Sequence, residues 1–532
     1  MFIHPSICTI GGKNKRTGSG NTYNINAGFV ACSLFKCRVT NSQKYKMTSR
    51  FSGALQITNL DDFITPSQEC IKPIEIQKSK SKTGAKIKIE EDGTPFELNE
   101  AGQSEKLQKV EITLADCLAC SGCITSAESV LVTQQSQEEL MRVFKEKVSQ
   151  RHQSKDDARS TFIVVSLSVQ AVLSIAKHYS LNPEQALNKL AGYFYQLGAD
   201  IVLDMTVADD FALLESAKEF IERYKAAKEG AKGQLPMLSS SCPGWVCYAE
   251  KTHGNFILPY ISVTKSPQQI MGSLVKYHLA ETMDLLPGQV YHVTVMPCYD
   301  KKLEASREDF YNYERKFRDV DCVITPIEIE QMLSEYNVSI NEIREREVEK
   351  LFESQMENFK TNLLGHSGSG SGGYAEFILR YAAKHLFDET DVTVEFKNLR
   401  NPDFQEAVFQ KDGHTLLTFA IANGFRNIQN LVQKLKRGKC TYDYVEVMAC
   451  PCGCLNGGAQ IRPSSNIQPR ELALQLESIY RELPRSNPEQ NIVVQNLYRN
   501  WLGGECTDKA LSYFHTQYHE IKKSDTALAI KW

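Results

Sequence analysis

The chain has 532 residues, enough for two or three domains with sizeable hydrophobic cores. Its 42% hydrophobic content, 23% charged content and formal net charge of −3 are ordinary for a globular protein, so they point to neither a nucleic acid nor a membrane as a partner. No stretch approaches the roughly 18 to 20 consecutive apolar residues that span a bilayer, and we therefore expect a soluble protein.

The first 46 residues differ from the rest in charge, with seven Lys or Arg and no Asp or Glu. An acid-free leader of this kind is typical of a transit peptide. Four glycines between residues 11 and 20 interrupt any amphipathic helix, however, and coherent sequence begins only at Phe51. We therefore favour the alternative that residues 1–46 are an upstream extension, absent from the mature protein, with Met47 as the functional start.

Residues 47–150 are expected to form an N-terminal metal-binding region that includes a polar linker. Residues 76–106 are rich in Lys and Glu, and Asp92-Gly93 is a turn signal between two alternating segments, which predicts a linker or a hairpin. A short alternating strand at 110–114 then leads into a group of cysteines.

Apolar strands alternate with amphipathic helices from about residue 160 to 470. Buried strands are predicted at 162–166, 201–207, 291–296, 320–325 and 444–448. Helices are predicted at 169–179, at 209–227 and in a segment that ends at 197. This alternation indicates an α/β fold with mostly parallel sheets. Residues 471–532 are predicted to form a helical, polar C-terminal region.

The chain contains sixteen cysteines, and several lie too close together in sequence to pair as disulfides, which favours metal thiolates. Cys117, Cys120 and Cys123 form a C-x2-C-x2-C loop that can wrap three corners of an iron–sulfur cubane, as in bacterial ferredoxins. A ferredoxin adds a Cys-Pro four residues later, but that position is Ala127. We predict Cys70 as the fourth ligand, because no other cysteine lies between the leader and this loop. Zinc is the competing interpretation, although three ligands on one short loop suit a cluster better.

A second set of cysteines follows the ends of predicted strands. Its members are Cys242, Cys298, Cys450 and Cys454. In open α/β sheets, ligands bind beyond the carboxyl ends of the strands. We therefore expect these four thiolates to converge and to complete a second cluster site.

Three motifs resemble the signature motifs of iron-only hydrogenases, in the same order. They are Ser-Cys-Pro-Gly-Trp at 241–245, Met-Pro-Cys-x-x-Lys-x-x-Glu at 296–304 and Glu-x-Met-x-Cys-x-x-x-Cys-x-x-Gly-Gly at 446–458. The resemblance covers roughly residues 110–525. The segment 47–75, together with Cys70, is similar to the branch of this family without hydrogenase activity, the nuclear prelamin A recognition factor-like proteins of cytosolic iron–sulfur cluster assembly.

This resemblance implies a two-lobed hydrogenase-like fold with the second cluster at the interface of the lobes. It implies two [4Fe-4S] clusters, held by the four plus four cysteines named above. It also implies an assembly factor of the cytoplasm, and of the nucleus as well, that links an early P-loop scaffold complex to a late targeting complex with a WD-repeat subunit.

The chain ends in Trp532, whose indole and terminal carboxylate together form a compact recognition signal. Proteins that engage the targeting complex often resemble this in ending with an aromatic residue. The alternative is a tail without a recognition role, because Lys531 replaces the usual acidic neighbour.

Two positions depart from the hydrogenase pattern. The residue before Cys242, a proton-relaying cysteine in the hydrogenases, is Ser241, and a hydroxyl is a poor substitute for a thiol in that step. The third motif continues as Ala459-Gln460-Ile461, where the hydrogenases have Gly-Gln-Pro. We therefore expect a protein that is not an enzyme. Two alternatives stay open: a redox enzyme with residual hydrogenase-like electron transfer, and a zinc-stabilised interaction protein.

Three weaker signals have structural explanations. Gly368 to Gly373 satisfies G-x-G-x-x-G, but no strand is predicted before it, so we expect a turn that caps a helix at 374–384 and shields the second cluster. His515 and His519 are four residues apart on a predicted helix, and we expect packing rather than metal binding. Five further cysteines are predicted not to be ligands: Cys247, Cys322 (in a buried strand), Cys440, Cys452 and Cys506.

Overall fold

The computed structural model describes residues 86–89, 95–98, 104–106, 131–132, 134–153, 161–231, 233–350, 363–462 and 467–521. The extension 1–46, the predicted ligands Cys70, Cys117, Cys120 and Cys123, and Trp532 lie outside these residues. The N-terminal region contributes an antiparallel sheet of β1 (Lys86–Ile89), β2 (Pro95–Leu98) and β3 (Ser104–Lys106). This pairing confirms the predicted hairpin around Asp92-Gly93.

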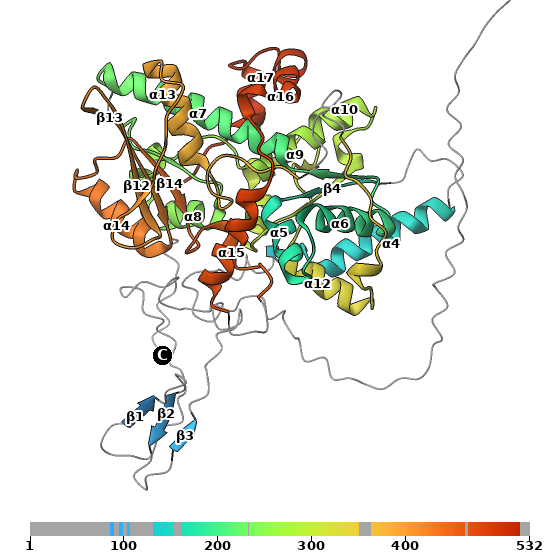
Figure 1. Cartoon of the computed structure of the whole chain (residues 1–532). Coiled ribbons are helices and arrows are strands. Elements are labelled where there is room, and N and C mark those ends of the chain that lie inside the picture. Colours follow the sequence, from blue (N-terminus) through green and yellow to red (C-terminus); the bar gives the residue numbers. More distant parts are fainter. Residues whose placement is uncertain are drawn as a thin grey trace, which may run out of the picture. The chain divides into compact units, whose positions relative to one another are not determined.

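The first large sheet is parallel throughout, in the order β10-β7-β4-β5. Its strand β4 is labelled in Figure 1. Its strands are β4 (Phe162–Leu167), β5 (Ile201–Asp204), β7 (Val290–Val295) and β10 (Cys322–Ile324). β4 is central, and every residue after Phe162 in it is buried. A strand covered on both faces reads as a continuous apolar run, which is why the sequence predicted it well.

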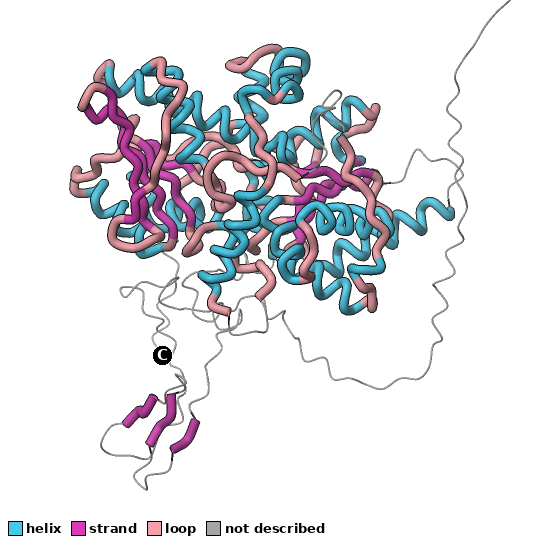
Figure 2. Tube along the Cα trace, viewed as in Figure 1, coloured by secondary structure: helices cyan, strands magenta, loops and turns pink. Residues whose placement is uncertain are grey.

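Helices cover this sheet on both faces (Figure 2). On one face lie α4 (Gln137–Gln153), α5 (Val169–His178), α6 (Pro183–Leu197) and α12 (Pro326–Glu335). On the other face, Val164 of β4 packs with residues of α7 (Thr206–Lys228) and α9 (Pro267–Ser273). Local sequence sets the ends of α6: Asn182 forms a capping box with Gln185, Pro183 opens the first turn, and Gly198 ends the helix in the left-handed conformation at φ 112°.

The second large sheet is mixed, in the order β11-β12-β13-β14-β6. Its strands are β6 (Met237–Ser239), β11 (Lys397–Asn398), β12 (Phe404–Lys411), β13 (His414–Asn423) and β14 (Tyr444–Met448). β13, β14 and β6 are parallel, whereas β12 and β13 form an antiparallel hairpin. Asp412 and Gly413 make its turn, both with positive φ, as a tight hairpin requires. This hairpin was not expected from the sequence.

One predicted boundary is wrong. The strand expected at 201–207 ends at Asp204, and α7 (Thr206–Lys228) begins two residues later rather than at Asp209. The cause is local, because Asp204 Oδ1 accepts a hydrogen bond of 2.7 Å from the Thr206 N–H and so turns the chain.

The two sheets share a hydrophobic core. Helices α7 and α13 (Tyr374–Phe387) pack together, and their buried side chains contact residues of both sheets. Further elements complete this region: α8 (Pro243–Tyr248), α9 (Pro267–Ser273), α10 (Ala280–Thr282), α11 (Asp300–Ala305), β8 (Tyr311–Asn312), β9 (Phe317–Arg318) and α14 (Phe425–Lys436).

The C-terminal region is helical, as expected, with α15 (Pro469–Glu482), α16 (Ile492–Asn496) and α17 (Asp508–Phe514). It packs on the core through aromatic side chains. The ring of Phe211 in α7 lies 4.6 Å from that of Phe514 and 4.9 Å from that of Tyr498. Figure 1 shows this region, in red, lying across the elements of both sheets.

The prediction that His515 and His519 share a helix is wrong. α17 ends at Phe514, because His515 turns into an extended pairing with Thr264. Each imidazole then meets a different carboxylate: His515 Nε2 lies 2.9 Å from Glu215 Oε2, and His519 Nε2 lies 3.0 Å from Asp309 Oδ1.

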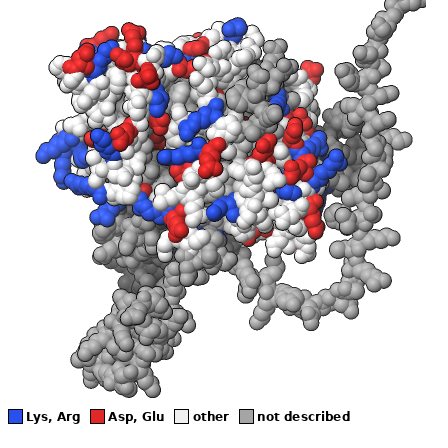
Figure 3. All heavy atoms as spheres, viewed as in Figure 1, with Lys and Arg blue, Asp and Glu red and all other residues white. Residues whose placement is uncertain are grey.

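Acidic and basic side chains are interspersed on the face shown in Figure 3. In the described part of the chain, no helix combines the length and the apolar character that crossing a membrane requires.

Candidate cluster-binding site

Cys242 lies just beyond β6, as the N-cap residue of α8. Ser240 Oγ donates to the Val447 carbonyl and accepts a 3.0 Å hydrogen bond from Cys242 N–H, which ties this loop to β14. The Cys242 sulfur accepts a 3.4 Å hydrogen bond from Ala449 N–H. Since β6 and β14 are parallel neighbours, the loops that follow them leave the same edge of the sheet.

The loop after β14 carries Cys450, Cys452 and Cys454 in a tight turn. Cys452 and Gly453 both have positive φ, at 59° and 72°. The backbone of Cys452 is fixed by its N–H bond to Asp403 Oδ1, at 2.8 Å, and by its carbonyl, which accepts from a serine of the glycine-rich loop. This turn brings the Cys454 sulfur to 3.8 Å from Met448 Sδ.

Cys298 comes from the other large sheet, beyond the end of β7. The two loops touch at Pro297, whose carbonyl accepts a 3.1 Å hydrogen bond from Ala459 N–H. A side chain at Gly457 would collide with the same carbonyl, so glycine permits the close approach. The structure therefore brings together loops from two sheets, as the positions of the second-set cysteines at strand ends predicted.

Burial and nearby acidic groups oppose ionisation of the thiols in this set. Burial and then Asp300 raise the pKa of Cys298 well above its usual value, and the thiols of Cys450, Cys242 and Cys454 raise it further. Burial likewise raises the pKa of Cys450, and it raises that of Cys454 to about 12. Without a bound cation these groups stay protonated, whereas iron stabilises their thiolate forms.

Among the described residues, no three His, Cys, Asp or Glu side chains lie close enough to hold one metal ion. The preference for a cluster over zinc stays a prediction from the cysteine spacing.

Charged groups around the thiols are paired and buried. Lys301 Nζ lies 2.9 Å from Glu304 Oε2, and Glu304 Oε1 accepts hydrogen bonds from Ser266 and Gln268. Both members of the ion pair are less than a tenth exposed. These two motif residues therefore pair their charges within the core.

The glycine-rich loop at 368–373 lies directly against the third motif. Ser371 Oγ donates to the Cys452 carbonyl at 2.8 Å, and a side chain at Gly372 would collide with Glu446 and Met448. Gly373, with φ 74°, is the N-cap residue of α13. The predicted helix-capping turn is thus confirmed, whereas its shielding of a cluster stays a prediction.

Sequence reasoning missed the proximity of Cys247 to the second set. It lies in α8, five residues after Cys242, and both line a cavity of about 30 Å³ together with Ser241, Thr516 and Tyr518. Burial raises the pKa of the Cys247 thiol to about 12. The spacing of five residues from Cys242 was the available signal. Cys322, by contrast, is fully buried in β10, as predicted.

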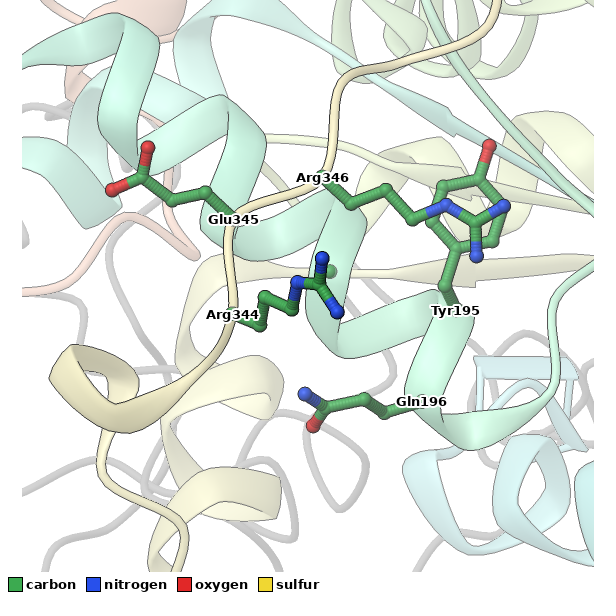
Figure 4. Close-up of a pocket in the computed structure, with 6 residues that line it drawn as sticks. Tyr195, Gln196, Arg344, Glu345 and Arg346 are labelled. Carbon is green, nitrogen blue, oxygen red and sulfur yellow. The ribbon is translucent and has the colours of Figure 1, made fainter. Parts of the chain in front are cut away.

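A larger hollow of about 430 Å³ lies between α6 and the segment at 344–346 (Figure 4). Figure 4 shows the Arg346 guanidinium over the ring of Tyr195, 3.6 Å from its centroid, with Glu345 pointing away. No cysteine lines this hollow, so it cannot supply thiolates to iron.

Comparison with known proteins agrees with this geometry. The profile of the iron only hydrogenase large subunit, C-terminal domain, matches residues 161–458, and that of the iron hydrogenase small subunit matches residues 469–521. A probable cytosolic Fe-S cluster assembly factor of Anopheles gambiae is 58% identical over 488 residues, which are 91% of this chain and 100% of that protein. A second, of Drosophila virilis, is also 58% identical, over 486 residues and the same shares of both chains.

The chain belongs to the family of iron-only-hydrogenase-like cytosolic Fe–S cluster assembly factors. Its fold is also similar to that of an apo [FeFe]-hydrogenase variant from Chlamydomonas reinhardtii, with a TM-score of 0.61 and 25% identity. That match covers 71% of this chain and 99% of the hydrogenase. Members of this family therefore share an architecture with hydrogenases, and the residues at the site decide their chemistry.

Proposed function

We propose that this protein is a cytosolic factor of iron–sulfur cluster assembly that binds two [4Fe-4S] clusters and is not an enzyme. The observation that carries the proposal is the contact between the cysteine-bearing loops of both large sheets, in a chain 58% identical to named assembly factors. Cys242, Cys298, Cys450 and Cys454 hold one cluster.

The other cluster is held by Cys117, Cys120 and Cys123, with Cys70 as fourth ligand. Support for it comes from the sequence, because C-x2-C-x2-C spacing suits three corners of a cubane. When bound, each cluster supplies one-electron redox chemistry or serves as cargo for transfer. The thiolates of this chain hold it; in the second set Cys242 is buried, whereas Cys298, Cys450 and Cys454 are partly exposed.

Two features favour an assembly factor over a redox enzyme. Ser241 replaces the thiol that relays protons in the hydrogenases. The cavity beside it, about 30 Å³, has room for one or two water molecules but not for a further metal centre. An assay with a strong reductant should therefore yield no hydrogen above the background of free cluster, and turnover would favour the enzyme instead.

The proposed partners are an early P-loop scaffold complex and a late targeting complex with a WD-repeat subunit, for maturation of cytosolic and nuclear iron–sulfur proteins. Trp532 is proposed as a contact to the second complex, because an indole next to a terminal carboxylate offers an apolar anchor and a charge together.

Iron and acid-labile sulfide counts, with electron paramagnetic resonance spectra, test the proposal on anaerobically purified full-length protein. Two clusters require about eight irons and eight sulfides per chain. Cys450→Ser and Cys117→Ser should each lose about half of the iron and leave a different residual spectrum, whereas Cys322→Ser serves as a matched control and loses none. A colourless protein with stoichiometric zinc would refute cluster binding.

A further inference from the structure

The chain after α17 runs as an extended segment, residues 515–521, along the edge of the candidate site. Its first part is held by backbone hydrogen bonds. Lys265 N–H donates to the Phe514 carbonyl at 2.7 Å, and Thr516 N–H donates to the Val263 carbonyl at 2.8 Å. These bonds extend the pairing of Thr264 with His515.

Its second part is held at Glu250, a buried residue just after α8. The backbone N–H of His519 donates to Glu250 Oε1 at 3.0 Å, and that of Ile521 donates to the Glu250 carbonyl at 3.3 Å. The Glu250 carboxylate is itself fixed by two 2.8 Å hydrogen bonds from Arg307. A rigid acceptor therefore anchors the far end of the segment.

Between the two anchors, Thr516 and Tyr518 line the cavity that contains Ser241, Cys242 and Cys247. The Tyr518 ring faces the Arg307 guanidinium, 5.9 Å from ring centroid to carbon. The C-terminal segment thus supplies one wall of the cavity, and the loop that carries Cys242 supplies another. While the segment stays in place it closes this side of the cavity, so access from this side requires the segment to move.

We propose that residues 515–521 form a strap that seals the Cys242 side of the thiol site from solvent and opens it when released. The part that concerns the cluster rests on the proposed function, whereas the part that concerns thiol access does not. In the sequence the strap is followed by residues 522–532, which include Trp532.

Thiol labelling in the full-length apo protein tests the strap. Iodoacetamide should modify Cys247 about tenfold faster or more in Tyr518→Ala than in the wild type, because the wall of the cavity is lost. Tyr518→Phe keeps the ring and should label at the wild-type rate. Tyr513→Ala removes a neighbouring ring that does not line the cavity, and it should also leave the rate unchanged.

Labelling of Cys322, which is buried in the other sheet, reports global unfolding in the same samples. Tyr518→Ala could accelerate the labelling of Cys247 and Cys322 equally, by unfolding the protein. In that case Asn255→Ala tests the strap instead, since it removes only the 2.6 Å hydrogen bond from Asn255 to Glu520 of the strap. Unchanged Cys247 labelling in the folded variants would overturn the proposal.

In the loaded protein, an iron(II) chelator should bleach the visible absorbance faster in Tyr518→Ala than in Tyr518→Phe. A protein that carries no cluster would defeat the proposed function, yet the labelling rates would still decide whether the strap seals the thiols. The two ideas therefore fail separately.

Discussion

Glu446 shows how burial sets the chemistry of a single residue beside the site. Its side chain is 3% exposed, and burial raises its pKa to about 7. Hydrogen bonds from the start of α13 act in the opposite direction, including one of 2.8 Å from Ala375 N–H to Oε2. The folded protein therefore retains a proton on Glu446 at a pH where the unfolded chain releases it.

This difference predicts that the buried Glu446 side chain lowers the free energy of unfolding as the pH rises. A carboxyl group with a raised pKa stabilises the fold below about pH 4.5, and that contribution is lost as the pH rises toward 7. Glu446→Gln should therefore be more stable than the wild-type apo protein by up to about 3 kcal/mol at pH 8 and nearly equal to it at pH 5. Urea unfolding at both values measures the difference. The exposed Glu482→Gln is the control, and a gap that does not grow with pH would contradict the assignment.

At the scale of elements, close approach decides where glycine is required. Gly272 lies in α9. A Cβ atom added at this position would lie 2.8 Å from the Cβ atom of Asp319 and 2.9 Å from the carbonyl oxygen of Asp319. Asp319 is held in place by its 3.2 Å ion pair with Lys265. Helix propensity alone favours alanine in a helix, so packing and propensity oppose each other here.

We expect the steric clash at Gly272 to outweigh the higher helix propensity of alanine. Gly272→Ala should lower the free energy of unfolding by about 1 to 3 kcal/mol, because backbone atoms cannot move aside cheaply. Gly288→Ala is the matched control: nothing lies within 4 Å of its added carbon, and its stability should change by less than about 0.5 kcal/mol. Thermal or urea unfolding compares the two. Stabilisation by Gly272→Ala would show that α9 packs more loosely.

At the scale of the whole molecule, Asp210 joins the C-terminal region to the core. This fully buried carboxylate of α7 contacts His366 Nε2 at 2.6 Å, Asn491 Nδ2 at 2.6 Å and Ser486 Oγ at 3.0 Å. Burial by itself lowers the pKa of His366, but the hydrogen bond with Asp210 raises it above its usual value. One charge thus organises three segments that are distant in sequence.

Asp210→Asn should loosen this junction, because an amide cannot accept from all three partners. Breaking a buried charged network costs about 3 kcal/mol or more. We expect faster limited proteolysis within residues 467–521 and a lower unfolding midpoint. The exposed Asp412→Asn should match the wild type, since asparagine also tolerates positive φ. Proteolysis that starts elsewhere would indicate a different weak point.

Several strands, the shared cysteine site and the family were predicted from the local sequence. The apolar runs of β4, β7 and β14 predicted strands. The cysteines that follow β6, β7 and β14 predicted a shared site, because ligands of α/β proteins bind beyond the carboxyl ends of strands, although β7 belongs to the other sheet. The motifs at 241–245, 296–304 and 446–458 predicted the family, which relatives 58% identical confirm.

Other features followed only from the tertiary structure. The β12–β13 hairpin, the end of α17 at Phe514 and the approach of Thr516 and Tyr518 to Cys247 all depend on contacts between distant residues. The periodicity of apolar residues within one element predicts which of its faces is buried. It does not predict the register between elements. The sequence by itself determined which thiols stand at strand ends and which family the chain joins. Packing alone decided which segment closes over them, because a seal is made by surfaces that meet only after folding.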